Sequence, residues 1–231
     1  MLRYFALVPA AGSGNRMGEL RPKQYIELAG KPLLYHALAA LCAVPRIERV
    51  FVVLAADDSD WQSFDWRDFS PKVKPLSCGG ATRAGSVWNG LQAIGSEVGD
   101  SDWILVHDAA RPCLTRQHIQ ILIDEIGDDE TGGILATPLA DTLKREGNQR
   151  RIAATLERDR LWQAQTPQMF RYGLLKQALG RTRGVTDEAG AVEALGLQPK
   201  LVAGDMTNLK VTYPLDLQLA EWILRARKEQ K

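Results

Sequence analysis

The sequence has few of the residues that build disulfide frameworks and thiolate metal sites. Its 231 residues include three cysteines, which are odd in number, widely spaced and form no C-x-x-C pair: Cys42, Cys78 and Cys113. Neither a disulfide framework nor a thiolate metal site is therefore predicted, and a reducing, cytoplasmic location fits best. The three histidines show no spacing that would converge on zinc.

Long hydrophobic runs and an excess of one charge are also absent. The apolar stretch at residues 4–8 stops at Pro9, so it is too short for the hydrophobic region of a signal peptide. No segment approaches the ~18 apolar residues of a membrane span. Lys and Arg total 29 against 28 Asp and Glu, and this +1 balance gives no reason to expect nucleic acid or an anionic membrane as the main partner.

What remains is the composition of an ordinary globular protein, with 45% apolar and 25% charged residues. We find no internal repeat, no low-complexity segment and no composition break that would mark a domain boundary. We therefore expect residues 1–231 to form a single domain.

Short apolar runs alternate with helical periods in the first half of the chain. Residues 4–8, 50–54 and 103–106 have the continuous, β-branched or aromatic character of strands buried on both faces of a parallel sheet. Between and after them, apolar residues recur at helical spacing around residues 34–41, 87–94 and 119–126. This alternation predicts βαβ units, and hence an α/β fold with a mostly parallel sheet flanked by helices.

The rhythm changes after residue 132. Residues 134–138, 142–145 and 152–156 have the pattern of strands, and residues 146–148 between the last two read Glu-Gly-Asn, a turn signal. We expect a hairpin or protruding arm at about residues 138–160. Further on, the pattern predicts helices at 174–179 and 188–195, short strands at 200–202 and 209–212, and a final helix that begins at Pro214.

A loop of very small residues follows the first predicted strand. Residues 9–17 read Pro-Ala-Ala-Gly-Ser-Gly-Asn-Arg-Met, at a strand end where α/β sheets bind ligands. The loop lacks the third glycine of a dinucleotide fingerprint and the Gly-Lys-Ser/Thr of a P-loop. Taken alone, its sequence fits a tight βα turn as well as it fits a ligand-binding loop. Arg16 and Lys23 favour a ligand, because a triphosphate and a phosphoryl-transfer transition state need cations beside such a loop.

Asp108 ends the third predicted strand and is the candidate Mg²⁺ ligand, since magnesium takes one or two carboxylates together with substrate phosphates. The alternative is a turn cap in a local Asp–Arg pair. Thr82 precedes a helical period and reads as its N-cap, whereas Gly80 and Ser86 can offer backbone and hydroxyl groups to a nucleobase. Without context, residues 166–168 and 186–189 read as ordinary turns or helix starts, and Arg158 and Lys210 as surface cations.

Taken together and in this order, these segments resemble the 2-C-methyl-D-erythritol 4-phosphate cytidylyltransferase family, CTP-dependent enzymes of non-mevalonate isoprenoid synthesis. The resemblance spans nearly the whole chain, through residues 9–17, 22–25, 79–86, 106–112, 141–142, 166–168, 186–189 and 210–212. It implies a Rossmann-like nucleotidyltransferase domain, CTP as co-substrate and Mg²⁺ as cofactor. It also implies a homodimer in which the β-arm of one subunit embraces the other.

The resemblance also assigns roles to individual residues. Arg16 and Lys23 correspond to transition-state stabilisers. The CTP pocket corresponds to Ala10, Ala11, Gly12, Gly14, Gly80 and Ser86, with Asp108 and Ala109 near the ribose and the metal. The methylerythritol phosphate site corresponds to Arg111, Thr142, Arg158, Thr166, Thr186 and Lys210.

Within the acceptor site, the resemblance implies that Thr142 and Arg158 come from the other subunit's arm, and that Arg158 and Lys210 hold the acceptor phosphate. Ala81 departs from the pattern, because relatives can carry an acidic residue there. A side-chain contact to the base or ribose is therefore not expected at this position, although the backbone of Gly80 and Ala81 can still bind.

The implied reaction is attack of an acceptor phosphate oxygen on the α-phosphorus of CTP. Such a nucleophile is already anionic, so no Ser-His-Asp or Cys-His pair is required, and none is evident in the sequence. A ribitol 5-phosphate cytidylyltransferase is the nearest alternative. A nicotinamide-dependent oxidoreductase is disfavoured by Met17 and by the Leu-Ala-Ala at residues 54–56, where a ribose-binding acid would stand. A non-catalytic nucleotide-binding protein would leave Arg16, Lys23 and Asp108 without a shared purpose.

Overall fold

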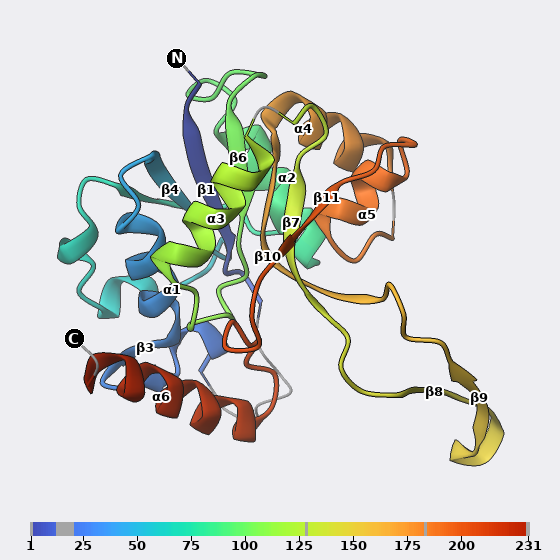
Figure 1. Cartoon of the computed structure of the whole chain (residues 1–231). Helices are drawn as coiled ribbons and strands as arrows, with labels where there is room; N and C mark the ends of the chain where they lie inside the picture. The colour runs from blue at the N-terminus through green and yellow to red at the C-terminus, as the bar shows by residue number, and fades with distance from the viewer. Residues whose placement is uncertain (1, 13–20, 128, 183, 230–231) are drawn as a thin grey trace.

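A seven-stranded sheet forms the centre of the molecule (Figure 1). The computed structural model describes residues 2–12, 21–127, 129–182 and 184–229. The strand order is β11-β7-β10-β6-β1-β4-β5. These strands are β1 (Tyr4–Pro9), β4 (Ile47–Val53), β5 (Val73–Leu76), β6 (Trp103–Val106), β7 (Gly133–Pro138), β10 (Trp162–Arg171) and β11 (Lys200–Ala203). Strand β10 runs antiparallel to β6 and β7, and the other pairs are parallel, which confirms the predicted α/β class with a mostly parallel sheet.

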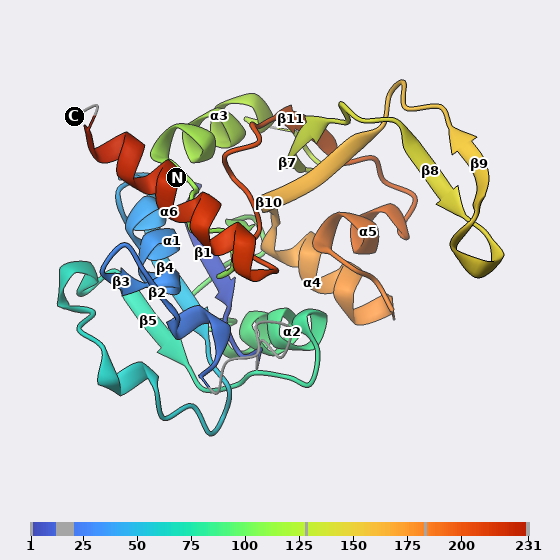
Figure 2. The same ribbon diagram turned by 90° about the horizontal axis from the view of Figure 1, so that it is seen from below.

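Helices cover both faces of this sheet (Figure 2). They are α1 (Leu33–Cys42), α2 (Arg83–Ala93), α3 (Arg116–Ile126), α4 (Tyr172–Arg181), α5 (Glu188–Glu193) and α6 (Pro214–Glu229). Short 3-10 turns are η2 (Lys23–Tyr25), η3 (Trp61–Ser63), η4 (Arg67–Phe69) and η5 (Asn148–Arg150), and β2 (Glu27–Leu28) pairs with β3 (Lys31–Pro32) in a small separate ribbon.

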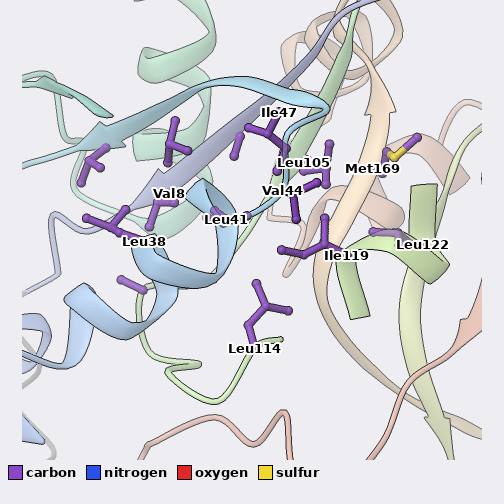
Figure 3. Close-up of a cluster of buried hydrophobic side chains, with 14 of the residues drawn as sticks. Val8, Leu38, Leu41, Val44, Ile47, Leu105, Leu114, Ile119, Leu122 and Met169 are labelled. Atoms are coloured by element: carbon purple, nitrogen blue, oxygen red, sulfur yellow. The ribbon is translucent and has the colours of Figure 1, made fainter. Parts of the chain in front are cut away.

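The side chains of β1 alternate between two hydrophobic cores. Ala6 and Val8 belong to the cluster under α1 and α3, which Figure 3 shows, whereas Phe5 and Leu7 belong to the cluster under α2 and α4. All four are buried, so the run at residues 4–8 is a strand covered on both faces, as predicted. A third, smaller cluster lies beneath α6 and includes Cys113 and Val211.

Three side-chain caps fix where helices begin. The hydroxyl of Thr82 accepts a hydrogen bond from Gly85 N at the start of α2, as predicted. Thr115 and His118 form a capping box at the start of α3. The carboxylate of Asp187 accepts from Gly190 N at the start of α5. The caps of α2 and α5 make Arg83 and Glu188 the first residues of their helices.

Three features of the sheet region were not predicted correctly. The strand expected at residues 209–212 is wrong, since this segment is an irregular loop. Strand β5 was missed because Pro75 interrupts its pattern, although an edge strand tolerates proline. Strand β10 was missed because Pro167 and several glutamines break its apolar run. The pairing of β10 with β7 shifts register between Ala164 and Gln168, which accommodates the proline.

Strands β8 (Leu143–Glu146) and β9 (Ile152–Leu156) form a separate antiparallel sheet. In both views this hairpin lies apart from the seven-stranded sheet (Figures 1 and 2). Most of its side chains are exposed, including Ile152 at 67%. Its role in dimerisation stays a prediction. None of the described helices is long and apolar enough to cross a membrane.

Candidate active site

A cavity of about 320 Å³ opens at the carboxyl ends of β1 and β6, where sheets of this class bind ligands. It brings together many of the residues that the sequence resemblance assigned to the site. These lining residues are Ala10, Ala11, Gly12, Lys23, Gly80, Ser86, Asp108, Ala109 and Lys210. Gly14 and Arg16 lie outside the described residues.

The two glycines after β5 are required by close backbone packing. A Cβ atom on Gly79 would lie 2.3 Å from the Cβ of Ala11 and 2.8 Å from the carbonyl oxygen of Leu54. A Cβ atom on Gly80 would lie 2.8 Å from the carbonyl carbon of Gly85. Only glycine therefore lets this loop lie against both the small-residue loop after β1 and the start of α2.

The hydroxyl of Ser86 shapes the same loop. Gly80 N donates to Ser86 Oγ at 3.0 Å, and Ser86 Oγ donates to the carbonyl oxygen of Thr82 at 3.0 Å. Ser86 is buried, although it lines the cavity. In this arrangement the side chain stabilises the glycine loop, and its contact with a nucleobase stays a prediction.

Asp108 lies between two cations on the wall of the cavity. Its Oδ1 is 2.6 Å from Arg83 Nε, and its Oδ2 is 2.8 Å from Lys210 Nζ. Asp108 is only 7% exposed, and burial alone would raise the pKa of its carboxyl group. The two cations outweigh burial and hold this pKa well below its ordinary value, so Asp108 is a carboxylate at neutral pH. Within the described part of the chain, no three His, Cys, Asp or Glu side chains gather as a metal site.

Arg83 connects Asp108 to a second carboxylate, that of Glu188. Its Nη1 and Nη2 lie 2.7 and 3.0 Å from Glu188 Oε1 and Oε2, a bidentate pair. Glu188 is 1% exposed, and burial raises its pKa while the Arg83 charge opposes this shift. Neither residue was predicted as part of the site. Both stand in segments that carry the resemblance. Glu188 gave no separate signal, because an acidic residue is common in the first turn of a helix.

Lys210 stands on a loop that several contacts hold in place. Val211 N donates to the carbonyl oxygen of Ala110 at 2.8 Å, and Lys23 Nζ donates to the carbonyl oxygen of Val211 at 2.8 Å. Arg111 Nη1 donates to the carbonyl oxygen of Asn208 at 2.7 Å. In this chain Arg111 therefore supports the loop of Lys210, and its contact with a substrate stays a prediction.

Thr166 sits behind Asp108 and is buried. Its Oγ1 accepts a hydrogen bond from Asp108 N at 3.0 Å and lies 3.0 Å from His107 Nδ1. Burial lowers the pKa of His107 to about 4, so its imidazole is neutral at physiological pH. The neutral ring accepts the Thr166 hydroxyl proton at Nδ1 and donates from Nε2 to the carbonyl oxygen of Arg111, 3.2 Å away. Thr166 thus fixes the backbone that carries Asp108.

Of the predicted acceptor-site residues, only Lys210 lines the cavity, and Arg111 and Thr166 lie behind its wall. Thr142, Arg158 and Thr186 are not brought to the cavity by the described residues of this chain. All three are exposed. Thr142 and Arg158 flank the β8–β9 hairpin, where the guanidinium of Arg158 donates to the carbonyl oxygen of Ala140. Thr186 immediately precedes the N-cap of α5.

Comparison with known proteins decides which family has this arrangement. The family model of 2-C-methyl-D-erythritol 4-phosphate cytidylyltransferase matches residues 4–226. The chain belongs to this family. The cytidylyltransferase named 2-C-methyl-D-erythritol 4-phosphate cytidylyltransferase from Azoarcus sp. (strain BH72) is 63% identical over 225 residues, covering 97% of this chain and 95% of that protein. Its counterpart from Dechloromonas aromatica (strain RCB) is 61% identical over 228 residues, covering 99% of this chain and 100% of that protein.

Solved cytidylyltransferase structures share the fold. A crystal structure of 4-diphosphocytidyl-2C-methyl-D-erythritol synthase has a TM-score of 0.87 and 40% identity, covering 97% of this chain and 99% of that one. The cytidylyltransferase from Francisella tularensis has a TM-score of 0.81 and 34% identity, covering 96% and 99%. These findings confirm the family predicted from the sequence and its cytidylyltransferase activity. They favour methylerythritol phosphate over ribitol 5-phosphate as the acceptor.

Proposed function

We propose that the cavity between the loop after β1 and Asp108 transfers CMP from CTP to 2-C-methyl-D-erythritol 4-phosphate, with release of pyrophosphate. The observation that carries this proposal is the pairing of a glycine-lined pocket with the Lys210–Asp108–Arg83 ion cluster at one sheet edge. Such a pocket lets backbone groups approach a triphosphate, and the cluster supplies a cation for a second phosphate.

In this reaction a phosphate oxygen of the acceptor attacks the α-phosphorus of CTP in line. The bond from the α-phosphorus to its bridging oxygen breaks, and the electron pair leaves with pyrophosphate. The nucleophile carries its own negative charge, so no side chain has to remove a proton. The chain's contribution is positioning and charge, with Lys23 and Arg16 assigned to the developing negative charge and Lys210 to the acceptor phosphate.

Backbone groups of the two small-residue loops are the proposed CTP contacts. Ala10, Ala11, Gly12 and Gly14 would take the triphosphate, and Gly80 with Ser86 would take the cytosine edge. Asp108 and Ala109, at the end of β6, would lie beside the ribose. Ala81 lines the same cavity with a methyl group, so recognition at this position has to come from the main chain.

Asp108 is also the proposed protein ligand for Mg²⁺. A carboxylate oxygen on the cavity wall is the donor type that magnesium prefers, together with substrate phosphates and water. Arg83 and Lys210 already balance the charge of Asp108, so we expect the ion to bind with the triphosphate rather than to the chain alone. When bound, the ion withdraws charge from phosphate oxygens.

Two further acceptor contacts, Thr142 and Arg158, are assigned to a second copy of the chain. Residues 1–231 would form one cytidylyltransferase domain whose arm, at about residues 138–160, reaches across a homodimer. The exposed hairpin, and the position of Thr142 and Arg158 beside it, support this assignment. Arg158 would then bind the acceptor phosphate together with Lys210, and Arg111, Thr166 and Thr186 would complete the pocket. We place the enzyme in the cytoplasm, where its three free cysteines stay reduced.

Transfer of an isotopic label tests the reaction. With CTP labelled at the α-phosphate, methylerythritol phosphate and Mg²⁺, the label should appear in a cytidine diphosphate product, and unlabelled pyrophosphate should form in equal amount. Label in free CMP would show hydrolysis by water, and label left in CTP would show no reaction. Either result would contradict the proposal.

A further inference from the structure

The guanidinium of Arg83 bonds two carboxylates that come from different parts of the fold. Its Nε lies 2.6 Å from Asp108, at the end of β6, and its Nη atoms lie 2.7 and 3.0 Å from Glu188, at the start of α5. The planar fork of arginine suits this double pairing, which a lysine ammonium cannot reproduce with the same geometry.

The two cations on Asp108 differ in how firmly they are held. The Arg83 side chain is 26% exposed and has the buried Glu188 as a second anchor. The Lys210 side chain is 44% exposed and reaches Asp108 from a loop. Arg83 is therefore the inner, fixed partner of the carboxylate, and Lys210 is the outer partner that faces incoming substrate.

Strand β10 holds Glu188 in position through Gln168. Gln168 Nε2 donates to Asp187 Oδ2 at 2.9 Å, and Gln168 Oε1 accepts from Ala189 N at 2.9 Å. The Gln168 side chain is buried, and its two hydrogen bonds fix the first turn of α5 against the strand that neighbours β6. The orientation of Arg83 is consequently set by the sheet itself.

We propose that Arg83 and Glu188 are positioning residues that keep Asp108 ion-paired and in place, so that Lys210 can leave Asp108 and bind the phosphate of the acceptor. This inference rests on the proposed function. The four groups carry two positive and two negative charges. When Lys210 moves to a phosphate, Arg83 stays paired with Asp108 through Nε while its Nη atoms hold Glu188. Without Arg83, the same movement would leave the buried Asp108 carboxylate with no cationic side chain beside it, which is unfavourable.

The effect should therefore fall on the acceptor more than on CTP. Removal of the inner pair ties Lys210 to Asp108 and should raise KM for methylerythritol phosphate by about tenfold or more. KM for CTP should rise by a smaller factor, because Asp108 is only one of the proposed CTP contacts and the others lie on the small-residue loops.

The double variant Arg83→Met/Glu188→Met tests this expected difference between the two KM values. It removes both charges of the pair, so neither Arg83 nor Glu188 is left buried without its partner. Arg83→Met by itself would strand Glu188 in the core and risks misfolding, whereas the double change replaces both charges with side chains of similar length. Arg83→Lys keeps one positive charge without the fork, and its KM should fall between those of the wild type and the double variant.

Arg49→Met/Glu97→Met is the matched control. This pair has the same residue types at 2.6 Å, and Arg49 lies beside Phe5 near the amino-terminal end of β1, far from the cavity. Both KM values of the control should match those of the wild type.

An unchanged KM for the acceptor in the double variant, or equal increases for both substrates, would overturn the inference. Failure of the wild-type enzyme to transfer CMP at all would instead contradict the proposed function.

Discussion

Lys23 donates a hydrogen bond from Nζ to the carbonyl oxygen of Val211, 2.8 Å away and 188 residues later in the chain. Val211 directly follows Lys210, so the cation assigned to the transition state is bound to the loop that carries the cation assigned to the acceptor phosphate. The η2 turn and the loop before α6 are thereby linked beside the cavity, which Lys23 and Lys210 both line.

Replacement of Lys23 should mainly affect the chemical step. We expect Lys23→Ala to lower kcat by about 10²-fold or more, as the loss of a preorganised charge at a transition state does. Steady-state kinetics with both substrates saturating measures this effect. Lys31→Ala is the control, because Lys31 is exposed and packs over the ring of Tyr35. A near-normal kcat in Lys23→Ala would remove Lys23 from the mechanism.

Gly79→Ala should damage the fold and the CTP site together. The new methyl group would meet Ala11 and Leu54 at distances that force the backbone apart, which costs about 1–3 kcal/mol of unfolding free energy. Urea denaturation and KM for CTP measure the two consequences. At Gly99 an added Cβ would lie 3.5 Å from Asp102 Oδ2, an ordinary contact, so Gly99→Ala should change neither quantity strongly. Equal stability of both variants would contradict this packing argument.

The proposed exchange of arms predicts complementation between two inactive variants. Lys23→Ala and Arg158→Ala would each be impaired as homodimers, for different reasons. After unfolding and refolding as an equal mixture, half of the dimers are mixed, and each mixed dimer has one intact site. We expect about a quarter of the wild-type activity to return. If the mixture is no more active than its components, Arg158 acts within its own subunit or not at all.

Cys113 should be unreactive although it lies close to the site in sequence. Its side chain is fully buried beneath α6, and burial raises the pKa of its thiol to about 11. The thiolate is the reactive form, so near pH 8 only about one thiol in a thousand is ionised, and this fraction grows tenfold for each pH unit up to the pKa. Alkylation with iodoacetamide followed by peptide mapping should label the partly exposed Cys78 well before Cys113. Equal labelling rates would contradict the buried position of Cys113.

The fold was predictable where a pattern is local. The strand at residues 4–8 and the loop after it could be recognised because buried parallel strands are apolar throughout and ligand loops follow their carboxyl ends. Strand β10 could not, because Gln165 and Gln168 stand where apolar residues are expected. Their amides bond other segments: Gln165 donates to the carbonyl oxygen of Asp205, and Gln168 to Asp187. The segment at 209–212 has the alternation of a strand, but Val211 packs beneath α6 and no strand forms.

Residues of the site, too, could be predicted only where their signal is local in the sequence. Asp108 and Lys23 could be singled out because each follows a recognisable segment. Arg83 and Glu188 could not, since they are 105 residues apart and their pairing depends on how the starts of α2 and α5 meet on one face of the sheet. The resemblance placed Thr166 in the acceptor pocket, and the structure adds that its hydroxyl supports Asp108 and His107 from behind.

Pyrophosphate release with alternative substrates tests the central claim most directly. Purified enzyme with Mg²⁺ would be supplied with CTP and either methylerythritol phosphate or ribitol 5-phosphate, and with ATP in place of CTP as the control. The account predicts rapid release with CTP and methylerythritol phosphate and little with the other combinations. Release with ribitol 5-phosphate alone, or no release with either acceptor, would contradict it.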